Sequence, residues 1–368
     1  TPLYSSAASD VYKRQSVYII AEIGQNHQGE FETASKLIDV ASQDIYHEGY
    51  ELKKCDAVKF QIRDLNHELT LEAWQAPYRN KNSFGETYGQ HREYLELSLD
   101  DYRKLAVQAR EKGLEVVVTI CNPDIVDEIA EKIKPDRYKI ASRDITNIPL
   151  IKKISTLKPK HVIFSSGFAC TDSLSVAYSY FTEATKRSIL YCVSEYPTPY
   201  EKLNFEQIEV LKKRFFDIVA VGFSDHTSGV LAPAVAVASG AELVEKHITL
   251  NRQMKGSDHA GSMDAEGFRR CVRDIRNTEK MIGGSQKFTL RGDPVLDKDT
   301  QKKWDIIGRA CAYKKDMEEG EKLLEKNIVM ISPPSGMDFE QVRRNYIGKP
   351  VLIRVKKNGI IKESHFTL

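Results

Sequence analysis

The 368-residue chain has no run of 18 or more apolar residues, so its sequence contains no candidate for a helix that crosses a bilayer. It also has no excess of one charge, because 54 lysines and arginines face 52 aspartates and glutamates and leave a net charge of +2. A balance this even excludes a chain-wide basic surface for nucleic acid or for a membrane. Any anionic ligand would have to be bound by a local group of basic side chains.

Signals for disulfides and for secretion are missing from the sequence as well. The six cysteines are scattered, without a CxxC pair or the spacing of a disulfide framework. No positively charged start followed by an apolar stretch marks a secretory signal. We therefore expect a protein of the reducing cytoplasm. Residues 1–15 are rich in serine and alanine and lack periodicity, and we interpret them as a non-native or disordered extension.

What the sequence does contain is an alternation of short β-branched runs with segments in which apolar residues recur at helical spacing. This alternation indicates an α/β fold with a parallel sheet, and eight units favour closure into a (β/α)8 TIM barrel. An open, doubly wound sheet is the alternative, but residues 23–29 do not match its GxGxxG turn. The eight runs are 17–21, 56–61, 114–119, 137–141, 162–165, 189–193, 218–223 and 243–247.

The length of the chain predicts two domains of unequal size. We assign residues 16–283 to the barrel and 306–368 to a small module, joined by a polar linker at 284–305. Two loops of the barrel are unusually long, at 43–54 and 64–98. Insertions of this length are more often functional or partner-facing than structural.

Two lysines lie within apolar, strand-like runs. Lys59 and Lys139 belong to the second and fourth predicted strands, at the C-terminal ends from which catalytic groups project in a barrel. A buried lysine without a partner would lose its proton, so an anion held between the two lysines is the cheaper arrangement. Phosphate or carboxylate fits best, and hydroxyl groups at other strand ends would be further donors. The hydroxyl candidates are Ser142, Ser166 and Ser224.

Two histidines stand at the ends of the last two predicted strands. His226 and His247 are 21 residues apart, on strands that must be neighbours in a barrel. A lone histidine there is more often a satisfied core residue, but a pair on adjacent strand ends suits a metal. Mn²⁺, Zn²⁺ and Mg²⁺ accept such ligands in different degrees, and two protein ligands leave positions for substrate and water. Asp225 and Asp258 are nearby in sequence and would serve the substrate or support the ligands.

Glu22 follows the first strand directly and would face the same mouth. In a purely structural role Glu22 would cap a helix or lie on the surface. Near a metal it would instead orient a hydroxyl or act as acid or base. His27, Tyr88, His91 and Arg92 are further candidates, although aromatic and basic clusters in loops are usually solvated surface.

Several motifs of the chain occur together, and in the same order, in one known family. They resemble the sialic acid synthase family and are AEIGQNHQG at 21–29, VKFQ at 58–61, YPTP at 196–199, GFSDHT at 222–227, EKHITL at 245–250 and KGSDH at 255–259. The resemblance runs from about residue 17 to the C-terminus. Arg309-Ala310 and residues 315–321 resemble the antifreeze-like (SAF) domain of these synthases, which is a β-clip module.

This resemblance implies a condensation of phosphoenolpyruvate with N-acetylmannosamine and water, which gives N-acetylneuraminate and phosphate. It implies one divalent metal, Mn²⁺ or Mg²⁺, held by His226 and His247, with Glu22 and these two histidines as the catalytic residues. It also implies a domain-swapped homodimer in which Arg309 reaches into the partner's barrel. The implied sugar ligands are Glu22, Tyr196, Asp258 and Arg309. The implied phosphoenolpyruvate ligands are Lys59, Gln61, Lys139, Ser142, Ser166, Ser194 and Ser224.

Departures from the family pattern leave the sugar open. Ser194 stands where bacterial members often have Asn, and Arg143 and Asp144 lie beside the fourth-strand site. Residues 77–89 resemble the animal 9-phosphate synthases, which favours N-acetylmannosamine 6-phosphate as an alternative substrate. An N-acylated sugar of the legionaminate or pseudaminate type is another. A non-catalytic protein of polysaccharide assembly or binding is the alternative of a different class, but unused buried charges would cost such a protein stability.

Overall fold

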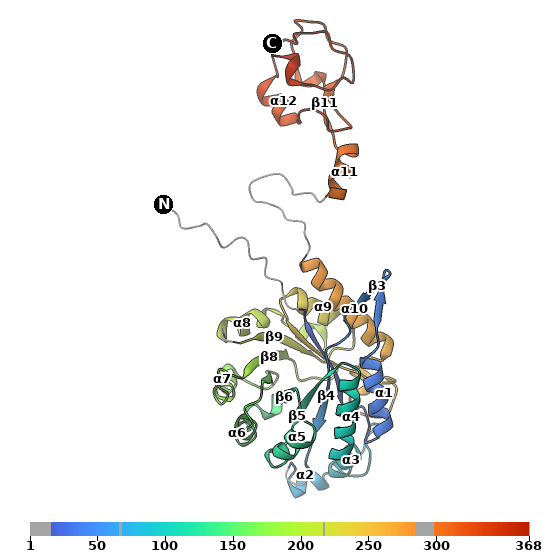
Figure 1. Cartoon of the computed structure of the whole chain (residues 1–368), viewed down its shortest axis with the longest axis vertical. Coiled ribbons are helices and arrows are strands. Elements are labelled where there is room, and N and C mark those ends of the chain that lie inside the picture. Colours follow the sequence, from blue (N-terminus) through green and yellow to red (C-terminus); the bar gives the residue numbers. More distant parts are fainter. Residues whose placement is uncertain (1–15, 66–67, 216–217, 284–297, 368) are drawn as a thin grey trace. The chain divides into compact units, whose positions relative to one another are not determined.

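The structure is a computed structural model, and its contacts divide the chain into two compact units, Thr1–Gly283 and Gly284–Leu368 (Figure 1). The predicted N-terminal extension and most of the predicted linker lie outside the described residues. The residues that the structure describes are 16–65, 68–215, 218–283 and 298–367.

Eight parallel strands of the first unit form a closed barrel in the order β1-β10-β9-β8-β7-β6-β5-β4. The predicted TIM barrel is therefore confirmed, and the open sheet is excluded because β1 pairs with both β10 and β4. All eight predicted runs overlap these strands. The strands are β1 (Tyr18–Gly24), β4 (Ala57–Ile62), β5 (Glu115–Ile120), β6 (Arg137–Ile140), β7 (His161–Ser165), β8 (Lys186–Cys192), β9 (Ala220–Asp225) and β10 (Leu243–His247).

Helices follow the strands and cover the outside of the barrel. Polar caps begin several of them; Ser98, for example, accepts a hydrogen bond from the backbone N–H of Asp101. Within the described ranges, no helix combines the length and the apolar character needed to cross a membrane. The covering helices are α1 (Phe31–Ala41), α4 (Leu99–Glu111), α5 (Val126–Lys132), α6 (Ile148–Thr156), α7 (Thr171–Ser179), α8 (Glu206–Arg214), α9 (Leu231–Ala238) and α10 (Ala265–Ile282).

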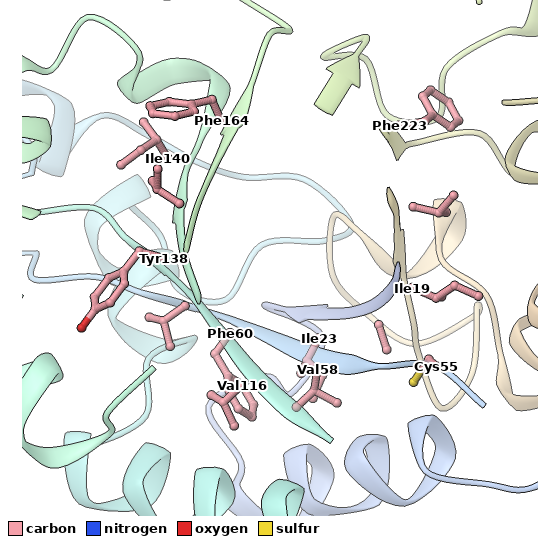
Figure 2. Close-up of a cluster of buried hydrophobic side chains, with 14 of the residues drawn as sticks. Ile19, Ile23, Cys55, Val58, Phe60, Val116, Tyr138, Ile140, Phe164 and Phe223 are labelled. Carbon is pink, nitrogen blue, oxygen red and sulfur yellow. The ribbon is translucent and has the colours of Figure 1, made fainter. Parts of the chain in front are cut away.

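Strand alternation sorts the barrel side chains into two faces. Outward residues such as Val58, Phe60 and Val116 pack between the strands and the helices, as Figure 2 shows. Inward residues from seven of the eight strands form an apolar layer across the barrel, which we call the floor. Polar residues lie inside the barrel on both sides of this floor. The floor consists of Ile20, Ala57, Val117, Ile163, Leu190, Ala220 and Leu243.

Both long loops contain secondary structure of their own. The first holds a hairpin of β2 (Ile45–His47) and β3 (Tyr50–Leu52), and its turn uses Gly49 at a φ of 81°, where glycine is favoured. The second contains two short helices, α2 (Leu71–Gln75) and α3 (Tyr88–Tyr94). The second loop follows β4 directly and so begins at the C-terminal end of the barrel.

The second unit has a small core of its own. It contains α11 (Lys298–Ile307), an antiparallel pair of β11 (Ala310–Tyr313) with β12 (Ile328–Ile331), and α12 (Phe339–Asn345). A small C-terminal region with β-strands is therefore present, while its assignment as an SAF domain stays a prediction. The buried core residues are Cys311, Tyr313, Met317, Leu323, Val342, Tyr346, Val351, Val355 and Ile361.

Candidate active site

A cavity of about 270 Å³ lies at the C-terminal ends of the barrel strands. It brings together eleven of the thirteen predicted site residues. Ser166 is not among the lining residues, and Arg309 belongs to the second unit. The predicted residues that line the cavity are Glu22, Lys59, Gln61, Lys139, Ser142, Ser194, Tyr196, Ser224, His226, His247 and Asp258.

The two predicted lysines share one buried carboxylate, which is Glu245. Its Oε2 lies 2.9 Å from Nζ of Lys139 and 3.3 Å from Nζ of Lys59. Strands β6 and β10 are far apart around the barrel, so the contact between Lys139 and Glu245 crosses its interior. Burial disfavours the ionised form of Glu245, but the two lysines outweigh burial and hold the pKa of this carboxyl below its usual range. The anion expected between the lysines is thus supplied by the chain itself.

Glu22 adds a second carboxyl to this cluster. Its Oε2 lies 3.2 Å from Nζ of Lys59. Burial raises the pKa of Glu22 to about 7, although Lys59 opposes the shift. When Glu22 holds a proton, two ammonium groups face one ionised carboxylate, that of Glu245, and the cluster has one net positive charge. This charge suits an anionic ligand.

The imidazole of His226 is held in one tautomer. Its Nδ1 lies 2.6 Å from the carbonyl oxygen of Val193 and therefore donates a proton to it. Its Nε2 accepts a hydrogen bond from the hydroxyl of Tyr196 at 2.7 Å. Burial, and then the neighbouring His247, lower the pKa of His226 to about 3, so the ring is neutral. A neutral imidazole whose Nδ1 is fixed by a carbonyl offers Nε2 as a metal ligand.

His247 has an unfinished set of hydrogen bonds. Its ring centroid lies 5.7 Å from that of His226, and burial lowers its pKa to about 4. Its Nδ1 is buried and finds no hydrogen-bond partner in the described part of the chain. A buried polar atom in this state is unusual and calls for a ligand. Groups of three or more metal-binding His, Cys, Asp or Glu side chains do not occur among the described residues, and the two-histidine metal site stays a prediction.

Two hydroxyls and a backbone amide lie close together just beyond the ends of β6, β7 and β8. Oγ of Ser142 accepts a hydrogen bond from the backbone N–H of Gly167 at 3.1 Å. A Cβ atom at position 167 would lie 2.2 Å from Oγ of Ser194 and 2.9 Å from Oγ of Ser142. Glycine therefore allows both hydroxyls to lie this close to the backbone. Hydroxyl and amide donors are groups that bind phosphate oxygens, and we call the three residues the hydroxyl cradle.

On β7 the structure brings Ser165 to the cavity, whereas sequence reasoning named Ser166. Ser165 lies two residues beyond Ile163 of the floor and therefore faces inward. The amide of Ser166 donates to the carbonyl of Leu190 on the neighbouring strand. The sequence prediction ignored the alternation that separates the two serines.

Three arginines that line the cavity form what we call the arginine wall: Arg63, Arg92 and Arg143. Glu68 pairs with Arg63 and, at 2.9 Å, with Arg143. The guanidinium of Arg92 instead donates two hydrogen bonds to the neutral hydroxyl of Tyr88, at 2.9 and 2.6 Å. The positive charge of Arg92 is thus less compensated than that of the other two.

The other loop candidates are held within the fold. Nε2 of His27 lies 3.3 Å from the hydroxyl of Tyr102, and Nδ1 of His91 accepts from the backbone N–H of Phe84 at 3.1 Å. Both histidines are buried. They therefore support the loops that surround the cavity.

Comparisons with known proteins show the family to which the chain belongs. The model of the NeuB family matches residues 49–287. N-acetylneuraminate-9-phosphate synthase of Homo sapiens is 31% identical over 350 residues, which cover 94% of this chain and 91% of that protein. N,N'-diacetyllegionaminic acid synthase of Campylobacter jejuni is also 31% identical, over 94% of this chain and 98% of its own length. The chain belongs to the NeuB family.

A solved structure extends this likeness to three dimensions. N-acetylneuraminic acid synthetase from Leptospira borgpetersenii, crystallised with citrate, is 27% identical with a TM-score of 0.64 and covers 79% of this chain and 90% of its own. The prediction of an enzyme of the sialic acid synthase family, a transferase that forms a carbon–carbon bond, is confirmed.

For this NeuB-family chain, sequence reasoning missed Glu245 although a signal was present. Glu245 and His247 are two residues apart in one strand run, so they share the inward face. Lys246, between them, points outward. A rule that follows each inward position along all eight strands would have found Glu245 together with Ser165. Arg63 carried no comparable signal, because it follows β4 in an irregular segment.

Proposed function

We propose that this NeuB-family enzyme condenses phosphoenolpyruvate with N-acetylmannosamine and water to give N-acetylneuraminate and phosphate. The observation that carries the proposal is that one cavity holds two different groups of side chains next to each other. Two lysines around Glu245 and the hydroxyl cradle suit a phosphorylated carboxylic acid, and two neutral histidines beside them suit a metal that meets an aldehyde. The names of the human and Campylobacter relatives, which are synthases of N-acetylneuraminate 9-phosphate and diacetyllegionaminic acid, support this reaction type.

Phosphoenolpyruvate would bind through its charged groups. Lys59 and Lys139 provide the two cations, and Glu245 holds both ammonium groups in place before the substrate arrives. Ser142 and Ser194 of the hydroxyl cradle would donate to phosphate oxygens. Such fixed donors bind a substrate without having to reorganise.

The residues of the cavity fit a bound Mn²⁺ or Mg²⁺. His226 and His247 would hold it, with Nε2 of His226 available once the Tyr196 hydroxyl turns away. When bound, such an ion polarises the aldehyde oxygen of the open-chain sugar.

The bond-forming steps use the enol of phosphoenolpyruvate as nucleophile. Its C3 attacks the aldehyde carbon, water adds to the cation left at C2, and phosphate leaves from the tetrahedral adduct. Glu22, whose carboxyl titrates near pH 7, is placed to give a proton to the aldehyde oxygen as it becomes a hydroxyl. Tyr196 and Asp258 would bind polar groups of the sugar. We further propose that Arg309 of a partner subunit completes the sugar site in a domain-swapped homodimer.

A phosphorylated sugar is the second candidate substrate, and the arginine wall favours it. Arg92 lines the cavity and donates to a neutral hydroxyl, so its charge is available to an anion. N-acetylmannosamine 6-phosphate would place a second phosphate within the cavity. Guanidinium groups recognise phosphate through paired hydrogen bonds.

Phosphate release from phosphoenolpyruvate, measured with each sugar, tests the proposal. We expect turnover with N-acetylmannosamine and no phosphate release without a sugar. A preference for the 6-phosphate, lost in Arg92→Met through a raised KM for that sugar alone, would replace the first candidate by the second. A preference for legionaminate- or pseudaminate-type precursors would replace both. Sugar binding without phosphate release from any of them would favour the non-catalytic alternative.

The metal is tested separately. We expect a chelator to abolish phosphate release and Mn²⁺ to restore it, because the aldehyde then regains its polarising ion. His226→Ala and His247→Ala should not respond to added Mn²⁺. Full activity in metal-free buffer would contradict the metal assignment.

A further inference from the structure

A buried ion pair lies on the outer face of the barrel directly behind the two cavity histidines. Asp225 on β9 and Lys246 on β10 are register partners, and their side chains are fully buried. Nζ of Lys246 lies 2.6 Å from Oδ2 of Asp225. Each partner immediately precedes one of the histidines, because His226 follows Asp225 and His247 follows Lys246.

The pair also holds the chain beyond His226. Oδ1 of Asp225 accepts from the backbone N–H of Thr227 at 2.8 Å, and Oδ2 accepts from its hydroxyl at 3.2 Å. Nζ of Lys246 donates to the carbonyl oxygen of Thr227. The ends of β9 and β10 are thus fastened together by side chains as well as by the sheet. We call these three residues the clamp.

Stability alone does not explain a charged pair at this place. Two register positions earlier, the outward partners are Phe223 and Val244, which are apolar and belong to the main core. Buried ion pairs often stabilise a fold no more than apolar residues of the same volume, because both charges lose their hydration. What the charged pair adds over an apolar one is a fixed geometry, set by directional hydrogen bonds.

The two histidines differ in how they are held. The ring of His226 has its own anchor in the Val193 carbonyl. The ring of His247 lacks a hydrogen bond at Nδ1 within the described residues, so its position depends on its backbone and on edge contacts with the rings of Tyr196 and His226. The residue before it, Lys246, is the one that the clamp fixes.

We infer that the clamp positions His226 relative to His247 and thereby sets the affinity of the cavity for its metal ion. Asp225 and Lys246 are positioning residues in this inference, since they act through the histidines and not on substrate. The inference rests on the proposed function, which assigns a metal to this pair. The inference adds that Asp225 and Lys246 hold His226 and His247 in place before the metal binds.

The decisive variant is the double substitution Asp225→Leu with Lys246→Met, which removes both charges together and leaves neither unpaired. Mn²⁺ binding, measured by calorimetry and by the electron paramagnetic resonance of free Mn²⁺, is the first readout. We expect the Mn²⁺ Kd to rise about tenfold or more, the usual effect of losing the supports of metal ligands. Phosphoenolpyruvate affinity without metal should change much less than the Mn²⁺ Kd, because Lys59 and Lys139 lie on β4 and β6 and Glu245 faces the inside of the barrel, away from the clamp.

A matched control separates positioning from stability. Phe223→Leu with Val244→Ala trims the preceding outward pair on the same two strands, and it should lower Tm without changing the Mn²⁺ Kd. If the control raises the Kd as much as the clamp variant does, or if the clamp variant binds Mn²⁺ like the original chain, the inference is wrong. Should the double variant fail to fold, Asp225→Asn with Lys246→Gln retains polar groups and serves the same comparison.

The outcome also distinguishes the inference from the proposed function. If the unmodified chain shows no Mn²⁺ binding, the metal assignment fails and the inference fails with it. If the unmodified chain binds Mn²⁺, His226→Ala abolishes binding and the clamp variant binds normally, only the inference fails.

Discussion

The barrel contains two polar layers, one on each side of the apolar floor, and they are built from similar parts. The layer at the N-terminal end, which we call the closed layer, consists of Tyr18, Glu115, Arg137, His161 and Ser188. Nε of Arg137 lies 2.7 Å from Glu115, its NH1 2.8 Å from Nδ1 of His161, and Nε2 of His161 2.8 Å from the Ser188 hydroxyl. The guanidinium also stacks 3.6 Å from the centroid of the Tyr18 ring.

The layer at the C-terminal end contains the same kinds of side chain but differs in how completely they are hydrogen-bonded. Both layers combine cations, carboxylates and a histidine whose pKa is low because of burial. In the closed layer each ring nitrogen of His161 has a partner, whereas Nδ1 of His247 has none among the described residues and faces a site with a cavity. A buried charge or a shifted pKa is therefore a poor sign of function by itself. An incomplete set of hydrogen bonds beside a cavity is a better one.

The largest expected effect that separates the two layers comes from Lys139→Met. The variant removes one of two cations that would hold phosphoenolpyruvate, and we expect kcat/KM to fall at least about 1000-fold, equivalent to about 4 kcal/mol. Glu245 keeps Lys59 as a partner, so Tm should fall by only a few degrees. Phosphate release and thermal unfolding measure the two quantities. A kcat/KM within tenfold of the original would remove Lys139 from the site.

The closed layer should respond to pH through stability. Burial, and then Arg137 and Lys186, lower the pKa of His161 to about 3, below its ordinary value of 6.5. The unfolded chain therefore takes up a proton first as the pH falls. The stability that neutral His161 contributes above about pH 6.5 is lost between pH 6.5 and 3, at up to about 1.4 kcal/mol per unit.

Urea unfolding of the original chain and of His161→Gln tests this dependence. The free energy of unfolding of the original chain, relative to the variant, should decrease by about 3 kcal/mol between pH 7 and pH 4. Glutamine cannot take up the proton and provides the reference. A difference that is the same at both pH values would show that His161 is not the titrating group.

Gly167→Ala tests the hydroxyl cradle. The new Cβ would meet the hydroxyls of Ser194 and Ser142, which must then move away from the phosphate position. We expect the KM for phosphoenolpyruvate to rise about 10- to 100-fold, with a loss of about 1–3 kcal/mol in stability from the crowding. An unchanged KM in steady-state assays would exclude the cradle as the phosphate subsite.

The smallest expected effect is that of Arg137→Met in the closed layer. Glu115 and Tyr18 lose their cation, but Glu115 is 44% exposed, so water compensates part of the loss. We expect a decrease of about 1–2 kcal/mol in the free energy of unfolding and an unchanged kcat/KM. Reduced turnover in a variant that is still folded would mean that the two layers are coupled through the floor.

Much of this architecture could be predicted from local patterns in the sequence. The eight strand runs carry their own period and turn signals, so the barrel followed from their number and order. Lys59, Lys139, His226 and His247 were found because each is a polar residue in an apolar run.

What the sequence did not reveal depends on contacts across the barrel. Lys139 and Glu245 are 106 positions apart, and their pairing exists only once the barrel closes. The choice between Ser165 and Ser166 follows only when the inward positions of all eight strands are considered together, because a single apolar run does not show which face turns inward. Glu68 reaches Arg143 from a long irregular loop, where no period constrains the side chains.

The floor has a kinetic consequence for the proposed reaction. It seals the barrel below Lys139 and Glu245, so a ligand for the lysines approaches from the mouth. On this route it passes His247, which lies two residues beyond Glu245 on β10, and the neighbouring ring of His226. A sugar seated at the imidazoles would obstruct that route. For the proposed reaction we therefore expect an ordered rather than a random sequential rate law, with the phosphorylated acid entering first and the sugar second.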